Sequence, residues 1–115
     1  MRKLLLVVFL FVLTFPCYAD FQPLEKEVNS LRSKLSTVDK ISKVDLEKSL
    51  NLLKEKASLI ENEIAKSDII GDCDILLNKY VHKNEKDDAP SDEVDYWLKH
   101  IVDDLAMFRK IGIDK

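Results

Sequence analysis

Cys73 lies between two acids, in the sequence Asp72-Cys73-Asp74, and is one candidate for chemistry in this chain. A catalytic thiol needs a lowered pKa, which a helix N-terminus or a nearby cation supplies. The flanking carboxylates act in the opposite direction because they disfavour the thiolate. A metal site would need further ligands, and His82, nine residues on, shares no helical face with Cys73. We therefore expect Cys73 to be a small apolar core residue, with an interchain disulfide as the alternative.

His100 is a second candidate, because Asp103 and Asp104 follow it at the spacing that places side chains on one helical face. A face of this kind is able to hold a metal ion. No further ligand is visible at matching spacing, so we expect solvent-facing side chains and predict no metal site and no cofactor. The sequence also has no GxSxG, HExxH or CxxCH motif and no glycine-rich phosphate loop. We therefore predict no catalytic residues and a protein that is not an enzyme.

Three aromatic residues form the predicted contact patch: Tyr80, Tyr96 and Trp97. Aromatic side chains with a polar group are enriched at protein-binding hot spots. The alternative for Trp97 is a position over the core of the domain. Acidic residues at 87–88 and 92–93 would complement a basic partner. We expect a protein partner that packs against a helix face.

Four amphipathic stretches must position these residues. Apolar side chains recur at helical spacing over residues 23–38, 43–66, 68–83 and 92–110. The chain has many Leu, Lys and Glu residues and few of the residues that build tight turns or half-buried strands. The patterns predict one all-α domain over residues 20–115, either a small four-helix bundle or a helical hairpin plus two further helices.

The first two stretches are expected to form the hairpin, over residues 21–66. Leu46 follows Val38 by eight positions and not by seven, which rotates the apolar seam by about 80° on a straight helix. One straight helix therefore could not bury both halves. Residues 42–45, Ser-Lys-Val-Asp, have the pattern of a helix N-cap. A turn near residues 38–42 is therefore predicted, with one long helix as the alternative.

The later helices carry further local signals. Leu52 and Leu59 widen the apolar stripe of the second helix, so that it would cover two neighbours. Gly71 either lies inside the third helix or ends the second. Ser91 is the predicted N-cap of the fourth helix, and Gly112 its end. Pairs of opposite charge four residues apart, Asp95–Lys99 and Lys99–Asp103, would lie on the surface of that helix.

Residues 1–19 have the pattern of a cleavable export signal, with Arg2 and Lys3 before an apolar run that ends at Pro16. The run of about 12 residues is shorter than the ~20 that a membrane span needs. The bulky residues before Cys17 do not suit a lipoprotein signal. We expect cleavage after Ala19, with an uncleaved anchor and lipidation as alternatives. The protein would be periplasmic in a Gram-negative host and secreted otherwise.

Charge and cysteine content then limit the function. Two of the 18 basic residues lie in the signal, so the mature chain would carry 16 against 21 acidic residues, a net charge of −5. It has no basic block, which argues against nucleic acid and anionic membranes as partners. Cys73 would be the one remaining cysteine, so no internal disulfide forms and stability must come from packing or self-association. No later segment is apolar enough to span a membrane.

These observations predict an exported helical protein that acts by binding another protein, as an adaptor, inhibitor, immunity-type or chaperone-like factor. A self-associating envelope component, with coiled-coil-like packing of the first two helices between chains, is the alternative. It would make the protein a homo-oligomer.

Overall fold

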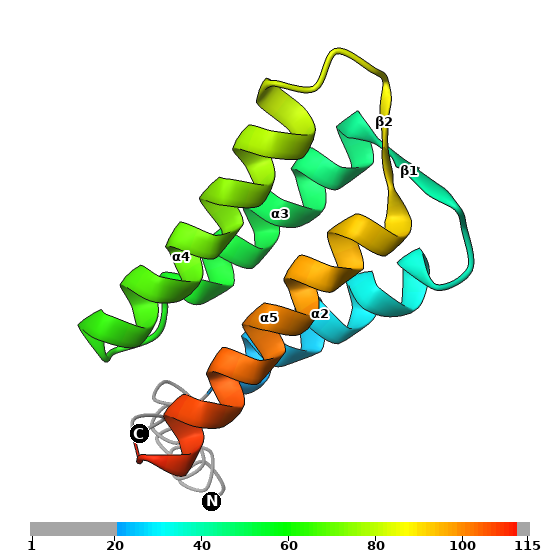
Figure 1. The fold of residues 1–115 in the computed structure, drawn as a ribbon. Helices are drawn as coiled ribbons and strands as arrows, with labels where there is room; N and C mark the ends of the chain where they lie inside the picture. Colours follow the sequence, from blue (N-terminus) through cyan, green and yellow to red (C-terminus); the bar gives the residue numbers. More distant parts are fainter. Residues whose placement is uncertain (1–20, 113–115) are drawn as a thin grey trace, which may run out of the picture.

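The computed structural model describes residues 21–112, which fold into four α-helices and one short two-stranded ribbon (Figure 1). In chain order the elements are α2 (Gln22–Leu35), β1 (Lys40–Ser42), α3 (Lys43–Ala57), α4 (Glu63–Leu77), the π-helical turn η1 (Asn78–His82), β2 (Asp88–Pro90) and α5 (Ser91–Lys110). The predicted all-α class is thus confirmed in its main feature. The export signal predicted for residues 1–19 lies outside the described residues. Among the helices of this part of the chain, none is long and apolar enough to cross a membrane.

The four helices pack in a ring. Each helix contacts the next one in the chain, and α5 closes the ring on α2. In Figure 1, α3 and α4 lie side by side, as do α2 and α5. Short connections make successive helices antiparallel. Helix α5 therefore has two neighbours, α2 and α4, and both of its interfaces carry charged residues.

The predicted break between the first two helices is confirmed, since α2 and α3 are separate helices, but the second helix of this hairpin ends at Ala57 and not at residue 66. The side chain of Ser42 caps α3 by accepting a hydrogen bond from the N–H of Asp45 at 3.1 Å. The strands were not predicted. β1 pairs with β2 in antiparallel register, with Ile41 opposite Ala89, and both of these side chains are buried. Three-residue strands are too short for a periodic pattern to reveal them.

The boundary between the second and third helices was wrong. The predicted helices 43–66 and 68–83 are divided instead by a break after Ala57. Asn62 begins the next helix, because its side chain accepts hydrogen bonds from two backbone N–H groups in the first turn, at 2.9 and 3.0 Å. Ile64 consequently lies in the first turn of α4 and is exposed, outside the stripe that was predicted for the second helix.

Other details of the pattern were also corrected. The first helix ends at Leu35, and Val38 is exposed. Leu52 and Leu59 are exposed as well, so the wide stripe predicted for the second helix is not buried. Gly71 lies inside α4, in agreement with one of the two interpretations.

The predicted end of α5 is confirmed, but its predicted N-cap was wrong. Ser91 was expected as the N-cap, but it is the first residue of the helix and its hydroxyl makes no hydrogen bond within the described chain. The pairing of β2 with β1 brings the N–H of Ser91 to the carbonyl oxygen of Asp39 at 2.9 Å, so this backbone group is satisfied by the ribbon. At the other end, Gly112 adopts a φ of +83°, as the predicted terminator of the helix should.

The core is one continuous cluster drawn from all four helices. Its members in α2 and α3 are Leu24, Val28, Leu31, Leu35, Leu46, Leu50, Leu53 and Ala57, and in α4 and α5 they are Ala65, Ile69, Cys73, Leu76, Leu77, Val94, Leu98, Ile101, Leu105 and Phe108. The seams of α2 and α3 are therefore buried within one chain, which gives no support to coiled-coil packing of these helices between chains.

Candidate functional site

The site residues predicted from the sequence are separated by the fold. Cys73 is fully buried, so its sulfur is not accessible for an interchain disulfide. Burial, together with the charges of Asp72 and Asp74, raises the pKa of the Cys73 thiol to about 12. The thiol is therefore protonated at neutral pH. His82 is exposed at the end of η1.

The three residues of the predicted aromatic patch differ in their exposure. Tyr80 is buried, and its hydroxyl donates a hydrogen bond to Glu93 Oε1 at 3.0 Å, so it offers little surface to a partner. Burial and this bond raise the pKa of Tyr80 to about 12. Trp97 is partly buried against the core, and Tyr96 stands 71% exposed with its ring edge-on to Trp97 at 6.1 Å. Only Tyr96 and the outer part of Trp97 remain available for contact.

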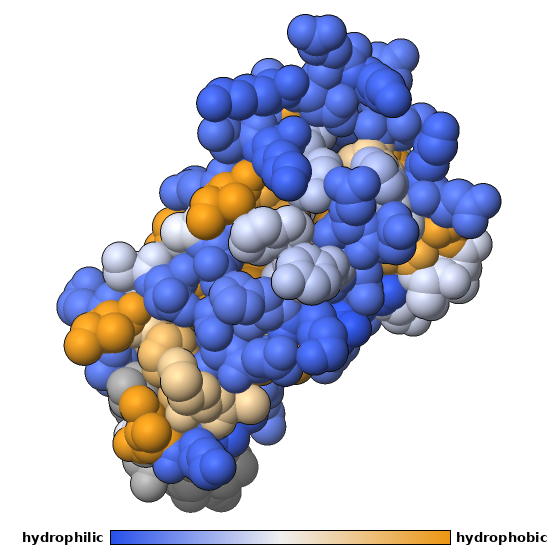
Figure 2. All heavy atoms as spheres, viewed as in Figure 1, coloured by the Kyte–Doolittle hydropathy of each residue, from blue (hydrophilic) through white to orange (hydrophobic). Residues whose placement is uncertain are grey.

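Figure 2 shows the face over α4 and α5 as mostly hydrophilic, with near-white side chains of intermediate hydropathy in its middle. Hydrophobic side chains gather toward the lower left, near the C-terminal end of α5 and the start of α4. Exposed apolar residues at these ends of the helices include Ile64, Met107 and Ile111.

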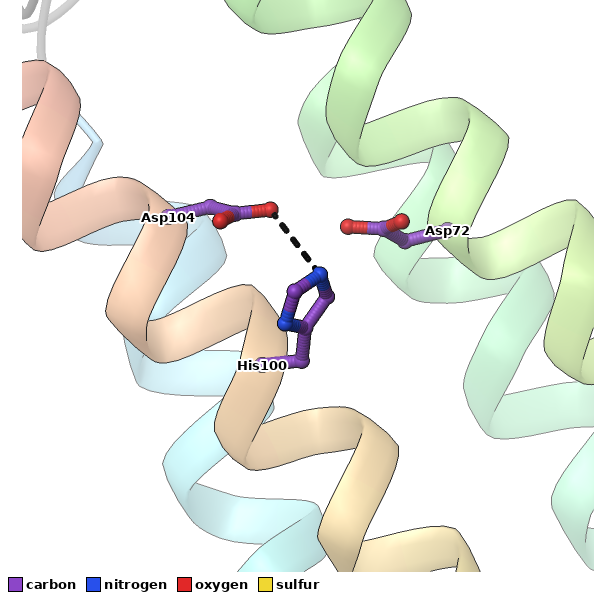
Figure 3. A group of neighbouring side chains, drawn as sticks. All are labelled: Asp72, His100 and Asp104. Carbon is purple, nitrogen blue, oxygen red and sulfur yellow. Dashed lines mark ion pairs between the residues drawn. The ribbon is translucent and has the colours of Figure 1, made fainter.

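The fold assembles a cluster between α4 and α5 that the sequence showed only in part. Asp72 of α4 faces His100 and Asp104 of α5 (Figure 3). One possible metal-ligand atom from each of the three residues lies within 4.8 Å of the other two. His100 Nε2 is 3.7 Å from Asp104 Oδ2. The predicted third member, Asp103, points elsewhere and pairs with Lys99 at 3.2 Å, the one of the two predicted surface pairs that forms.

The local sequence explains why these side chains meet. Asp68 and Asp72 are four residues apart on α4, directly before the buried Ile69 and Cys73. His100 and Asp104 have the same spacing on α5, directly before the buried Ile101 and Leu105. Each pair thus borders the apolar stripe of its helix, and packing the two stripes together brings the pairs face to face. This repeat, a polar residue followed by a buried apolar residue and again four positions later, was a signal in the sequence. It does not show which helix lies opposite.

The electrostatics of the cluster are unfavourable. Asp72 is only 9% exposed, and its Oδ2 makes no hydrogen bond within residues 21–112. Burial, followed by the charge of Asp68, raises the pKa of Asp72, while the charge of His100 acts in the opposite direction. Burial and the neighbouring carboxyl group of Asp104 also raise the pKa of Asp68. Three carboxylates therefore share a space in which like charge is costly.

The lysines of the two helices near this cluster are engaged with other acids. Lys66 pairs with Glu63 at 3.3 Å, and Lys99 pairs with Asp103. The imidazole of His100 is consequently the side chain that faces these carboxylates in the described structure. The arrangement is suited to receive a cation.

A separate acidic cleft lies where the end of α2 meets the start of α5. It has a volume of about 520 Å³ and is lined by Leu35, Ser36, Val38, Asp39, Ser91, Asp92 and Asp95. Three of these residues are carboxylates and two are large and apolar. The buried hydroxyl of Ser91, which makes no hydrogen bond in the described part of the chain, belongs to the same lining.

Comparisons of this chain with protein-family models, with curated proteins and with solved structures find no match.

Proposed function

We propose that this protein is exported and acts without catalysis, by binding a protein partner that inserts a basic side chain into the acidic cleft. The observation that carries the proposal is the chemistry of the cleft lining, which combines Asp39, Asp92 and Asp95 with the apolar side chains of Leu35 and Val38. The acidic balance of the whole chain points to the same kind of partner.

A lysine or arginine side chain matches the lining of the cleft because it has both an apolar part and a charged part. Its aliphatic stem packs on apolar surface, while its charged end seeks carboxylates. Val38 and Leu35 offer the apolar surface, and Asp39 and Asp92 offer carboxylates. Asp95 accepts hydrogen bonds from Arg32 Nε and Nη2 at 2.7 and 3.2 Å, which holds its carboxylate in position.

Tyr96 provides a second contact beside the cleft. It lies one helical turn after Asp92, and it is among the most exposed large side chains of the described structure. Its edge contact with the partly buried Trp97 already restricts the ring in the free protein. Binding of a partner therefore costs the ring little further conformational entropy. An exposed aromatic residue next to acids is a suitable contact for a basic segment that also carries an apolar residue.

The state of Cys73 supports a role without catalysis, since a thiol with a pKa of about 12 is a weak nucleophile at neutral pH. The self-associating alternative has less support, because the seams of α2 and α3 that it would use are buried within one chain.

The test is capture of a partner from a native extract of the producing organism, followed by affinity measurement with the purified partner. Tyr96→Ala is expected to cost about 2 kcal/mol of binding, roughly a 30-fold rise in Kd, as for a hot-spot residue. Asp92→Asn should slow association, and added salt should weaken wild-type binding, because steering by opposite charge is screened.

Two matched variants serve as controls. Val44→Ala removes an apolar side chain that is 74% exposed on α3, and Asp45→Asn removes an acid from the first turn of the same helix. Both should leave the affinity for the partner unchanged. A partner that binds Tyr96→Ala and Asp92→Asn as tightly as wild type, or that carries no basic residue at the contact, would overturn the proposal.

A further inference from the structure

The geometry points to a binding site for a divalent transition-metal ion between α4 and α5, with Asp72, His100 and Asp104 as ligands and Asp68 beside them. We place this site apart from the acidic cleft, and it does not rest on the proposed partner.

The spacing of the ligands is that of a metal site built on facing helices. Two residues four apart on one helix point in the same direction, and a second pair on an antiparallel neighbour can complete the set. Asp68 and Asp72 form one such pair, and His100 and Asp104 form the other. Ligand atoms from three of these four side chains already lie within 4.8 Å of one another, which is close enough to converge on one ion (Figure 3).

The buried oxygen of Asp72 is the independent sign that a ligand belongs here. Asp72 is nine-tenths buried, its carboxylate is directed toward His100 and Asp104, and its Oδ2 has no hydrogen-bond partner in the described structure. A buried acceptor without a partner is costly, and a buried charge is normally paired or coordinated to a metal. A divalent cation would satisfy this oxygen and also relieve the repulsion among the three carboxylates.

The ligand types select the class of ion. Calcium and magnesium prefer a shell of oxygen atoms alone, whereas imidazole suits zinc and other first-row transition metals. One imidazole with two or three carboxylates therefore favours zinc or manganese over the alkaline-earth ions. His100 is 54% exposed and Asp104 19% exposed, so the ion has a path from solvent. The site would tie α4 to α5 from the outside of the bundle.

Zinc binding can be measured directly. We expect calorimetric titration of the metal-stripped protein with Zn²⁺ to saturate at one ion per chain and the melting temperature to rise with zinc concentration. Trp97 provides an optical signal, because it is the only tryptophan in the chain and its ring lies 6.2 Å from that of His100. Its fluorescence should change in step with zinc binding. Mg²⁺ and Ca²⁺ should bind at least about tenfold more weakly.

Asp72→Asn and His100→Gln should each weaken zinc binding at least about tenfold, since even residues that only support a metal ligand often contribute that much. Asp103→Asn and His82→Gln are the matched controls. They remove a neighbouring acid and an exposed histidine outside the cluster, and should leave the zinc Kd within about twofold of wild type. Should Asp72→Asn fail to fold, Asp104→Asn takes its place.

The absence of saturable zinc binding would overturn the site, as would loss of binding in the His82→Gln control. Equal affinity for zinc and magnesium would overturn the transition-metal assignment. Zinc binding retained in Asp72→Asn and in Asp104→Asn would show that the ion is held elsewhere. None of these results depends on finding the protein partner, so the two proposals can fail separately.

Discussion

The two sides of α5 treat charge in opposite ways. Toward α2, two arginine–carboxylate pairs join the helices: Arg32 with Asp95 at 2.7 and 3.2 Å, and Arg109 with Glu25 at 2.7 and 2.9 Å. Toward α4, acids face acids, and within residues 21–112 the imidazole of His100 is the side chain that lies between them. Both interfaces share the same apolar core beneath them.

The difference shows that the charges are paired at the α2 interface and are not paired at the α4 interface. The pairs with α2 are two-point contacts of fixed geometry near the two ends of α5, so they define the register of the helices more than they stabilise them. The interface with α4 is held by apolar packing, while its acids oppose it. Repulsion among carboxylates lowers stability at the α4 interface. A bound cation would therefore change stability more at this interface than at the interface with α2.

The largest effect is expected from removing the core that both interfaces share. Ile101 is fully buried in α5. Ile101→Ala should lower the free energy of unfolding by about 2–5 kcal/mol, because it removes apolar contacts and leaves a cavity. Denaturant unfolding measures this loss, and hydrogen exchange should show α2 and α4 weakened together. Met107→Ala, at an exposed position of the same helix, is the control and should change stability by less than about 0.5 kcal/mol.

Removing one carboxylate charge should change the free energy of unfolding in opposite directions at the α4 and α2 interfaces. Without added metal, Asp72→Asn is expected to stabilise the protein by about 0.5–2 kcal/mol, because it removes one of the charges that repel each other at the α4 interface. Asp95→Asn should destabilise it, because Arg32 loses its charged partner. Thermal and urea unfolding at neutral pH measure both. Destabilisation by Asp72→Asn in metal-free buffer would mean that the α4 interface is not strained.

The pH dependence of stability should also report the repulsion at the α4 interface, with a smaller amplitude than the substitutions. The pKa of Asp72 is raised in the folded protein from its ordinary value of 3.8, so the folded state keeps a proton that the unfolded chain has released. Stability from this group is therefore complete below pH 3.8 and is lost as the pH rises through the raised pKa. We expect the stability difference between Asp72→Asn and wild type to grow over that rise and then level off. A constant difference would contradict the shift.

The smallest effect concerns the pairs with α2. A double-mutant cycle on Arg32→Ala and Asp95→Ala should give a coupling energy of about 0.5–1 kcal/mol, since both side chains are about one-third exposed. High salt should reduce this coupling. The same cycle on Lys99 and Asp103, an exposed pair within α5, should give less.

Local sequence was informative for several residues that act within their own helix, though not for Ser91, whose predicted role as N-cap was wrong. The N-cap at Ser42, the terminator at Gly112 and the buried seam of α5 follow from side chains within a few residues of one another. The second helix was misjudged because apolar spacing continues across the break after Ala57, and the Asn62 cap gives a weaker signal than the periodicity. The ribbon was missed because its short strands pair across 46 to 50 positions of the sequence.

By itself, the sequence determined an all-α domain, its helical faces and its acidic character, since periodicity and composition act over one or two helical turns. Only the tertiary structure decided which faces meet. It buried Tyr80, left Tyr96 outside and brought Asp72 to His100. The physical reason is that pairing between helices depends on how the stripes of a ring of four pack together, and no residue spacing within one helix encodes its neighbour.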